Sequence, residues 1–270
     1  MNKLLTALIG IMLVILCVSV GYRVFNKTEN TEEVINKEPE IQATIEPTQS
    51  SESTVAPVET PLPTSTPVVE ANDDRFTNTD SLLILVNKTH PISETYEPKD
   101  LVKPNVKSNK TGLSLRKEAA EALETMFNAA LNDNITLVLG SSYRSYNYQQ
   151  TLFTNYSKRD GEEAANKYSA RAGTSEHQTG LACDISDAAG AHYLKQSFKD
   201  TAEGMWLKDN AHRFGFILRF PLGKEDITGY MFEPWHFRYI GIEEATKVYE
   251  SNLTFEEYYN ILDWFFTVFI

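Results

Sequence analysis

One segment limits how this chain of 270 residues can fold more than any other, and it covers residues 27–75. Aromatic residues are few there, and prolines recur amid Thr, Ser and Glu. A segment of this composition buries too little apolar surface to offset the entropy lost on ordering. We therefore predict a disordered, acidic linker over residues 27–75, extended by its prolines, and a folded domain over residues 76–270.

Negative charge is concentrated in the same part of the chain. Residues 27–74 contain eleven acidic and two basic residues, which accounts for nine of the twelve net negative charges. So acidic a chain lacks the cationic surface from which nucleic-acid proteins gain most of their affinity, and we expect no nucleic-acid partner. Cys17 and Cys183 are too few for a disulfide framework or a thiolate metal cage, so a metal would need His, Asp or Glu ligands.

An uncharged, largely apolar stretch covers residues 4–22. A run of roughly 18 or more apolar residues is long enough to cross a bilayer. We predict that residues 1–26 form a membrane anchor, with a cleaved signal segment as the alternative. Leu16 stands where a lipoprotein signal needs a small side chain, so lipidation of Cys17 is disfavoured.

From residue 82 onward the hydrophobic pattern is typical of an α+β domain with a small antiparallel sheet and flanking helices. A helix is expected to begin at Ser114 and to bury a face that extends to Leu131. Further helices are expected over residues 148–157, over 202–214 and after the capping box formed by Thr254 and Glu257. Short strands are expected over residues 82–86, 135–139 (ended by Gly140), 182–186, 216–220 and 235–239, with a polar loop after residue 157.

Two segments combine histidine with carboxylate groups. His177 precedes Asp184, and Gly180 between them can take the positive φ that folds the loop back beside the strand. Glu233 precedes His236 in the second segment. Two histidines and one carboxylate are a common catalytic zinc set, and a further carboxylate can then act as the base. We therefore expect a zinc site in a cleft, although each of these residues taken singly is more often a cap or an ion-pair partner.

The geometry of the second segment requires a bend. In a straight strand the side chains of Glu233 and His236 would point to opposite faces, because side chains alternate. We expect Pro234 to bend the chain so that both side chains face one cavity.

Arg144 lies in a third polar segment, directly after the strand expected over residues 135–139. A fixed guanidinium at the end of a strand can bind a carboxylate or an oxyanion that develops during a reaction. A structural salt bridge is the alternative interpretation.

Taken together, these segments resemble the VanY-type D-alanyl-D-alanine carboxypeptidases and their L,D-carboxypeptidase relatives. The resemblance rests on residues 142–146 with Gln149, residues 175–182 with Asp184, and residues 233–239, and it extends from about residue 82 to residue 259. It implies the following roles: one zinc ion held by His177, Asp184 and His236; Glu233 as the catalytic base; Arg144 at the scissile carbonyl; and substrate contacts from Ser175 and Gln149. Trp235 is expected to form a wall for the substrate or to pack in the core.

The resemblance also implies a function. A domain of this family would act outside the cytoplasm and remove the terminal D-alanine from peptidoglycan stem peptides, held at the cell membrane by the N-terminal segment or secreted if that segment is cleaved. We expect a monomer. Pentapeptide (D,D) and tetrapeptide (L,D) substrates both remain open, as do two alternatives: an endopeptidase that cuts cross-links, and a zinc-containing wall-binding module without turnover.

Some residues receive a structural interpretation. Cys183 adjoins Asp184 but should face the other way, as a buried, inert thiol. The apolar residues 260–270 are expected to dock on the core as a helix, since they are too few to span a membrane. Three histidines outside the motifs are expected to be structural or exposed: His90, His192 and His212.

Overall fold

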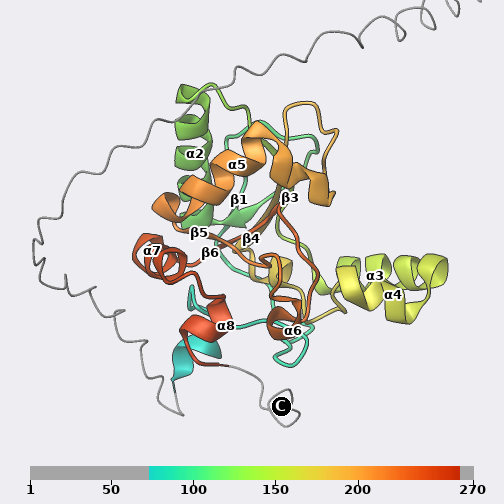
Figure 1. Ribbon diagram of the computed structural model, residues 1–270. Coiled ribbons are helices and arrows are strands. Elements are labelled where there is room, and N and C mark those ends of the chain that lie inside the picture. The colour runs from blue at the N-terminus through green and yellow to red at the C-terminus, as the bar shows by residue number, and fades with distance from the viewer. Residues whose placement is uncertain (1–72, 262–270) are drawn as a thin grey trace, which may run out of the picture. The chain divides into compact units, whose positions relative to one another are not determined.

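The structure is a computed structural model that describes residues 73–261 (Figure 1). The expected anchor, nearly all of the expected linker and residues 262–270 lie outside the described residues, so the predictions made for them stay predictions. Within the described part of the chain, no helix combines the length and the apolar character needed to cross a bilayer.

Four short strands form an antiparallel sheet in the order β3-β4-β6-β5 (Figure 1). Their bounds are Val138–Ser141 (β3), Ala182–Ser186 (β4), Phe216–Leu218 (β5) and His236–Tyr239 (β6). A separate antiparallel pair joins Leu101–Val102 (β1) to Leu115–Arg116 (β2). The predicted α+β fold with a small antiparallel sheet is confirmed.

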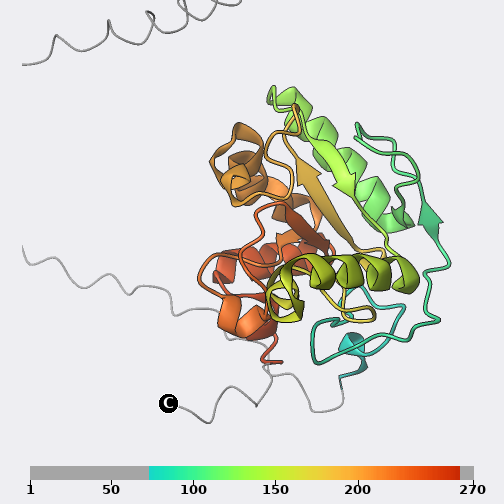
Figure 2. The same cartoon turned by 90° about the vertical axis from the view of Figure 1, so that its right-hand side faces the viewer.

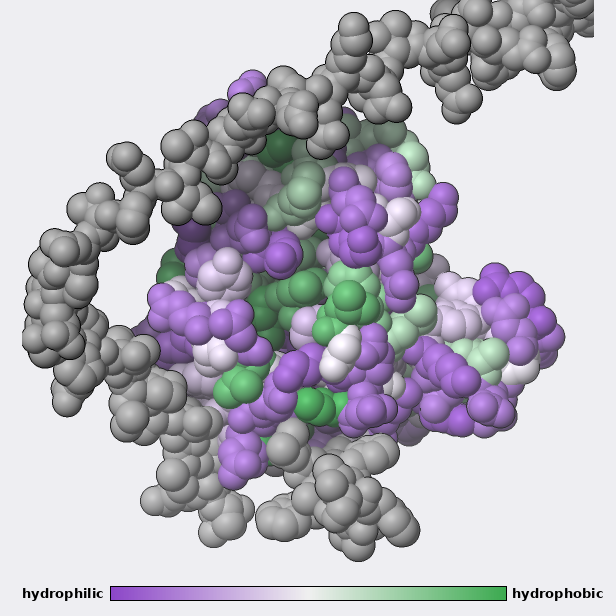
Figure 3. Space-filling model, in the orientation of Figure 1, coloured by the Kyte–Doolittle hydropathy of each residue, from purple (hydrophilic) through white to green (hydrophobic). Residues whose placement is uncertain are grey.

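Helices surround the sheet, and one pair of them, α3 and α4, projects from the body of the domain (Figures 1 and 2). The α-helices are Lys117–Asn132 (α2), Tyr146–Asp160 (α3), Glu162–Tyr168 (α4), Ala202–Asn210 (α5), Glu225–Thr228 (α6), Ile242–Ser251 (α7) and Phe255–Tyr258 (α8). Single 3-10 turns are Asp74–Phe76 (η1), Glu176–Thr179 (η2), Gln196–Asp200 (η3) and Ala211–Phe214 (η4). Hydrophilic residues cover the projecting helices, and apolar residues gather toward the middle of the same view (Figure 3).

The alternation of side chains gives the sheet two unlike faces. Cys183 and Phe237 belong to the main hydrophobic cluster, together with the buried faces of α2 and α5. The opposite face holds Asp184, His236 and Arg238, because β4 and β6 pair Asp184 with His236. The prediction that Cys183 is a buried thiol facing away from Asp184 is confirmed, and burial raises its pKa well above the usual value.

Residues 82–86, predicted as a strand, begin with a turn at residues 82–83 and are largely buried but lack strand pairing. The side chain of Arg238 takes the place of a neighbouring strand beside these residues. Arg238 Nη2 donates to the carbonyl oxygens of Leu82 at 2.9 Å and Ile84 at 2.8 Å. A buried guanidinium thus satisfies backbone groups that a neighbouring strand would otherwise satisfy.

Two predicted element boundaries are wrong: the end of a strand at Gly140 and the start of a helix at Ser114. Gly140 lies inside β3, where an added Cβ would lie 2.2 Å from Cε2 of Tyr193, so glycine is required by close packing. Ser114 does not cap α2, which follows Arg116 without a side-chain cap. The Ser114 amide instead donates to Ser142 Oγ at 2.9 Å and so ties this segment to the end of β3.

Helix α4 replaces part of the predicted polar loop. Gly161, with φ of 86°, separates α4 from α3, and the rings of Tyr156 and Tyr168 pack at 5.4 Å between the two helices. Tertiary packing therefore stabilises a helix too short to be recognised from its own pattern. In α2, the predicted buried face is confirmed except for Leu131, which is 61% exposed near the last turn.

A second hydrophobic cluster joins β5 to α7, α8 and the start of the described chain. Phe76, Phe255 and Tyr259 form its aromatic centre, with ring centroids 5.1 to 6.1 Å apart. The predicted capping box is confirmed, because Thr254 accepts from the Glu257 amide and Glu257 accepts from the Thr254 amide.

Candidate active site

Three elements bring His177, Asp184 and His236 together. The pairing of β4 with β6 places Asp184 opposite His236, and Gly180, with φ of 67°, ends η2 so that His177 lies over Asp184. His177 Nε2 lies 3.4 Å from Asp184 Oδ2, and His236 Nδ1 lies 3.1 Å from Asp184 Oδ1. All three are buried, and they form the single group of potential metal ligands found among residues 73–261.

The three residues fit a zinc ion. Zinc bonds to nitrogen and oxygen are about 2.0 to 2.2 Å long, so two ligand atoms of a tetrahedral ion lie about 3.3 Å apart. Each histidine nitrogen lies near that distance from one Asp184 oxygen, and one ligand atom from each of the three residues lies within 4.8 Å of the others. The other nitrogen of each ring is engaged. His177 Nδ1 donates to the Ser142 carbonyl at 2.7 Å, which leaves Nε2 as an acceptor. His236 Nε2 contacts Glu176 Oε2 at 3.3 Å and leaves Nδ1 toward Asp184.

The pKa values of the two histidines are shifted in opposite directions. Burial and the neighbouring Arg144 lower that of His177. Burial also lowers the pKa of His236, but hydrogen bonds to Asp184 and Glu176 outweigh it and raise the value to about 9. Burial alone would raise the pKa of Asp184, but the two histidines hold it well below its usual range. In the metal-free chain His236 is therefore a cation between two carboxylates.

Glu233 faces the same cavity, as predicted from Pro234. A turn at residues 234–235, closed by a 3.1 Å hydrogen bond from the His236 amide to the Glu233 carbonyl, replaces the straight strand. Glu233 Oε2 lies 4.0 Å from His236 Nδ1. Burial raises the pKa of Glu233 to about 8, which suits a group that both accepts and returns a proton near neutral pH.

Arg144 lies just beyond β3, beside Asp184. Its Nη2 is 3.8 Å from Asp184 Oδ2 and donates to Ser141 Oγ at 3.1 Å. Its Nη1 donates to Gln149 Oε1 at 2.6 Å. The guanidinium is thus held in one orientation at the edge of the cavity.

The three predicted substrate contacts lie in different places. Ser175 and Trp235 line the cavity, and Trp235 also packs against the main hydrophobic cluster. Gln149 is buried behind Arg144, because its amide donates to the Ala170 carbonyl at 2.6 Å while its oxygen accepts from Arg144. Its direct contact is therefore with Arg144, and a contact with substrate stays a prediction.

The cavity has a volume of about 660 Å³, enough for a short peptide end. Sequence analysis missed much of its wall, including Phe220, whose ring stacks on His236 at 4.9 Å. Further unpredicted wall residues come from α3, α4 and the segments after β4 and β5: Leu152, Tyr156, Tyr168, Leu194 and Tyr230. Tyr168 was missed because α4 was missed.

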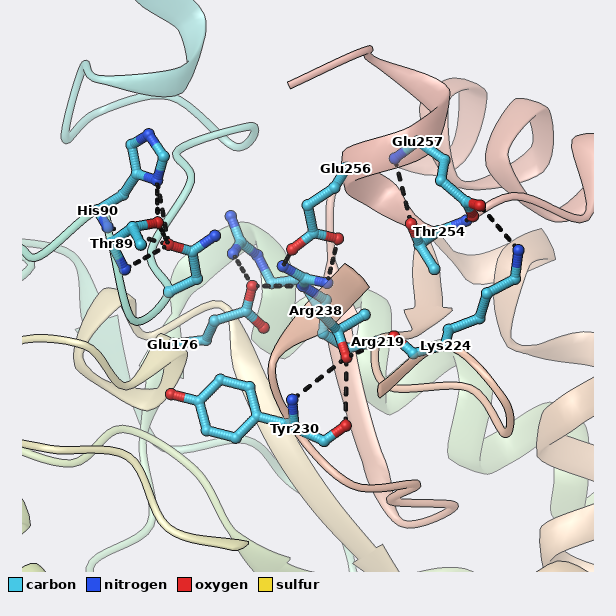
Figure 4. A network of polar contacts seen from close by, with 12 residues as sticks. Thr89, His90, Glu176, Arg219, Lys224, Tyr230, Arg238, Thr254, Glu256 and Glu257 are labelled. Carbon is cyan, nitrogen blue, oxygen red and sulfur yellow. Dashed lines mark hydrogen bonds and ion pairs between the residues drawn. The ribbon is translucent and has the colours of Figure 1, made fainter. Parts of the chain in front are cut away.

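Four buried charged residues form an ion-pair cluster behind His236: Glu176, Arg219, Arg238 and Glu256 (Figure 4). Sequence analysis missed their role, although a signal was present. Arg219 and Arg238 stand in otherwise apolar segments, and an arginine in such a segment is buried only with an acidic partner.

The remaining histidines lie outside the group of metal ligands, and His90 contacts Asn87 Oδ1 at 3.0 Å.

Comparison with known proteins gives the family. A family model of D-alanyl-D-alanine carboxypeptidases, VanY, matches residues 112–242. The putative carboxypeptidase YodJ of Bacillus subtilis (strain 168) is 46% identical over 186 residues, which cover 67% of this chain and 68% of that protein. The solved LdcB LD-carboxypeptidase is 44% identical with a TM-score of 0.65, covering 69% of this chain and 89% of that chain. A mutant VanY D,D-pentapeptidase in complex with Zn(II) is 36% identical with a TM-score of 0.53, covering 65% of this chain and 97% of that chain. The chain therefore belongs to the VanY family of D-alanyl-D-alanine carboxypeptidases.

Proposed function

We propose that this protein is a zinc-dependent carboxypeptidase that removes the C-terminal D-alanine from peptidoglycan stem peptides. One observation supports this most strongly. Glu233 and Arg144 flank the ligand set His177, Asp184 and His236, although neither is needed to hold a metal. A site that only held zinc for stability would gain nothing from a buried carboxylate and a guanidinium beside it.

When bound, zinc would lower the pKa of a water molecule and polarise the scissile carbonyl. Glu233 then acts as the general base for the attacking water. Its carboxylate accepts the proton and returns it to the amine of the leaving D-alanine. The buried, apolar wall at Phe220 and Trp235 keeps bulk water away from this proton transfer.

Arg144 stabilises negative charge on the oxygen of the scissile carbonyl. Ser141 and Gln149 each accept one of its N–H groups, and the remaining N–H groups can donate to that oxygen. Because the guanidinium is already oriented, little reorganisation is needed as the charge develops. Ser175 and Trp235 would contact the terminal residue of the peptide.

The relatives support both stem-peptide specificities. LdcB is named an LD-carboxypeptidase, and the VanY structure is of a D,D-pentapeptidase. We propose that this chain releases D-alanine, and the experiment below decides between tetrapeptide and pentapeptide. We also propose one zinc per monomeric chain, and an extracytoplasmic domain tethered by residues 27–75 to a membrane segment at residues 1–26.

The test is mass spectrometry of purified muropeptides incubated with the full-length chain, with Glu233→Gln as the control. Loss of one alanine from pentapeptides shows D,D activity, and loss from tetrapeptides shows L,D activity. Cleavage of cross-linked dimers without release of terminal alanine would assign an endopeptidase instead. Binding of muropeptides without any cleavage would assign a wall-binding module.

A further inference from the structure

The two histidines of the site are held from behind by different kinds of acceptor. His177 Nδ1 donates to a neutral backbone carbonyl, that of Ser142. His236 Nε2 faces a carboxylate, Glu176 Oε2, at 3.3 Å. Because a carboxylate only accepts, Nε2 carries a proton toward Glu176. Nδ1 faces Asp184 Oδ1 at 3.1 Å and is the ring nitrogen that a metal bound between His236 and Asp184 would meet.

Glu176 is itself fixed by two guanidinium groups. Its other oxygen, Oε1, accepts from Arg219 Nε at 2.7 Å and from Arg238 Nη1 at 2.8 Å. The Arg219 and Glu176 side chains are 0% and 2% exposed, so no solvent is present to replace these bonds. Oε1 is thus fully engaged, and Oε2 is left for His236.

The two arginines are anchored in turn. Both terminal nitrogens of Arg219 donate hydrogen bonds to the carboxylate of Glu256 in α8, at 2.8 and 2.5 Å (Figure 4). Arg238 donates to the carbonyl oxygens of Leu82 and Ile84. The ion-pair cluster therefore connects α8, the end of β5, β6 and the start of the domain to the carboxylate group of Glu176 behind His236.

We infer that Glu176 is a positioning residue, which holds the His236 ring in the orientation and tautomer that present Nδ1 to the metal. The other three members of the ion-pair cluster hold Glu176 in place. A carboxylate behind a metal-bound histidine raises the basicity of the ring and fixes its angle, and losing such a partner typically costs 10- to 100-fold in metal affinity. The inference rests on the proposed zinc site but concerns residues outside the ligand set.

Two matched variants separate positioning from simple stability. Glu176→Gln keeps the size of the side chain. Its single oxygen is needed by the two guanidinium donors at the Oε1 position, so its NH₂ group turns toward His236 Nε2–H and His236 loses its acceptor. Glu256→Gln changes a carboxylate in the same cluster, which also pairs with Arg219 but lies outside contact with His236. Both variants perturb the buried ion pairs, and only the first reaches the ligand.

The experiment measures zinc affinity by competition with a chelator, using the full-length wild-type chain and both variants. We expect Glu176→Gln to bind zinc about 10- to 100-fold more weakly and Glu256→Gln to stay within about threefold of wild type. If Glu176→Gln fails to fold, Glu176→Asp takes its place, because it keeps the charge for the arginines but withdraws from His236. The same loss of affinity is expected.

A second readout follows the His236 ring directly in the zinc-loaded protein. By ¹⁵N NMR, we expect the Nε2 proton to exchange with water faster in the Glu176 variant than in the wild type, with His177 unchanged. Wild-type zinc affinity in a folded Glu176 variant, or an equal loss in Glu256→Gln, would overturn the inference while leaving the proposed function intact. A wild-type chain that binds no zinc would overturn both.

Discussion

Two groups of buried charged residues meet at His236, and they differ in their balance of charge. The ion-pair cluster pairs two carboxylates with two guanidinium groups through hydrogen bonds of 2.5 to 2.8 Å. The site has the carboxylates of Asp184 and Glu233 but one guanidinium, Arg144, which is 3.8 Å from Asp184 and out of hydrogen-bond range.

The difference separates stability from function. A balanced buried cluster is complete in the metal-free chain, and breaking it should cost free energy of folding. The site is balanced by protons instead, because the pKa of Glu233 is raised to about 8 and that of His236 to about 9, and a metal ion that binds to His236 must displace its proton. Changes in the site should therefore affect metal binding and turnover, and changes in the cluster should affect stability.

The largest effect on activity is expected for Glu233→Gln. The amide keeps the shape of the side chain but cannot accept a proton, so kcat should fall by about 100- to 10,000-fold. Zinc should remain bound, and the free energy of unfolding of the metal-free chain should change little near neutral pH, because the raised pKa of about 8 keeps Glu233 protonated there and glutamine is a neutral group of the same shape. Near-normal turnover in the folded variant would assign the base to another residue.

Arg219→Met should reduce the stability of the fold, which Glu233→Gln should leave nearly unchanged. Removing one partner leaves Glu256 buried and uncompensated, which typically costs about 3 to 5 kcal/mol of unfolding free energy. Urea unfolding of the metal-free protein, run beside Glu233→Gln, provides the comparison. A loss below about 1 kcal/mol would show that the cluster contributes little to stability.

Arg144→Lys should reduce kcat more than it changes KM. Lysine keeps the charge but cannot reproduce the oriented fork held by Ser141 and Gln149. The loss of one donor to the developing oxyanion corresponds to about 2 to 4 kcal/mol in activation free energy. Steady-state kinetics on a D-alanine-terminated peptide separate the effect on kcat from the effect on KM. A rise in KM at constant kcat would instead place Arg144 on the terminal carboxylate of the substrate.

The smallest expected effect is the pH dependence of zinc affinity. The pKa of His236 is raised to about 9, so below that pH zinc must displace one proton from it. His177, with a lowered pKa, and Asp184, with a pKa well below its usual range, add no proton near neutral pH. The affinity should therefore fall about tenfold for each pH unit below about 9. Calorimetry in buffers of different ionisation enthalpy counts the released proton, and a count of zero would contradict the prediction.

The parts of the fold predicted correctly from sequence are those with local signals. Strand β4 matches its predicted bounds, and the Thr254 capping box is present, because both depend on neighbours in the chain. Five residues that the structure brings to one cavity were singled out because their residue types have a chemistry that a core does not need: His177, Asp184, His236, Glu233 and Arg144. Gly180 and Pro234 gave the local geometry that brings these residues together.

The errors share a physical cause, which is a partner distant in sequence. Residues 82–86 have the pattern of a strand, but Arg238, more than 150 positions later, satisfies the carbonyl groups of Leu82 and Ile84. Gly140 was expected to end its strand, yet the ring of Tyr193 explains it. The role of Glu176 depends on Arg219 and Arg238, and no spacing in the sequence shows that the three meet.

The most direct test of the account is zinc reconstitution of activity. The full-length chain is stripped with a chelator, titrated with zinc, and assayed for release of D-alanine from stem tetrapeptides and pentapeptides, with His236→Ala in parallel. We predict no release without zinc, recovery that saturates at one zinc per chain, and neither tight zinc binding nor release in His236→Ala. Full activity in the stripped wild-type protein, or stoichiometric zinc retained by His236→Ala, would contradict the account.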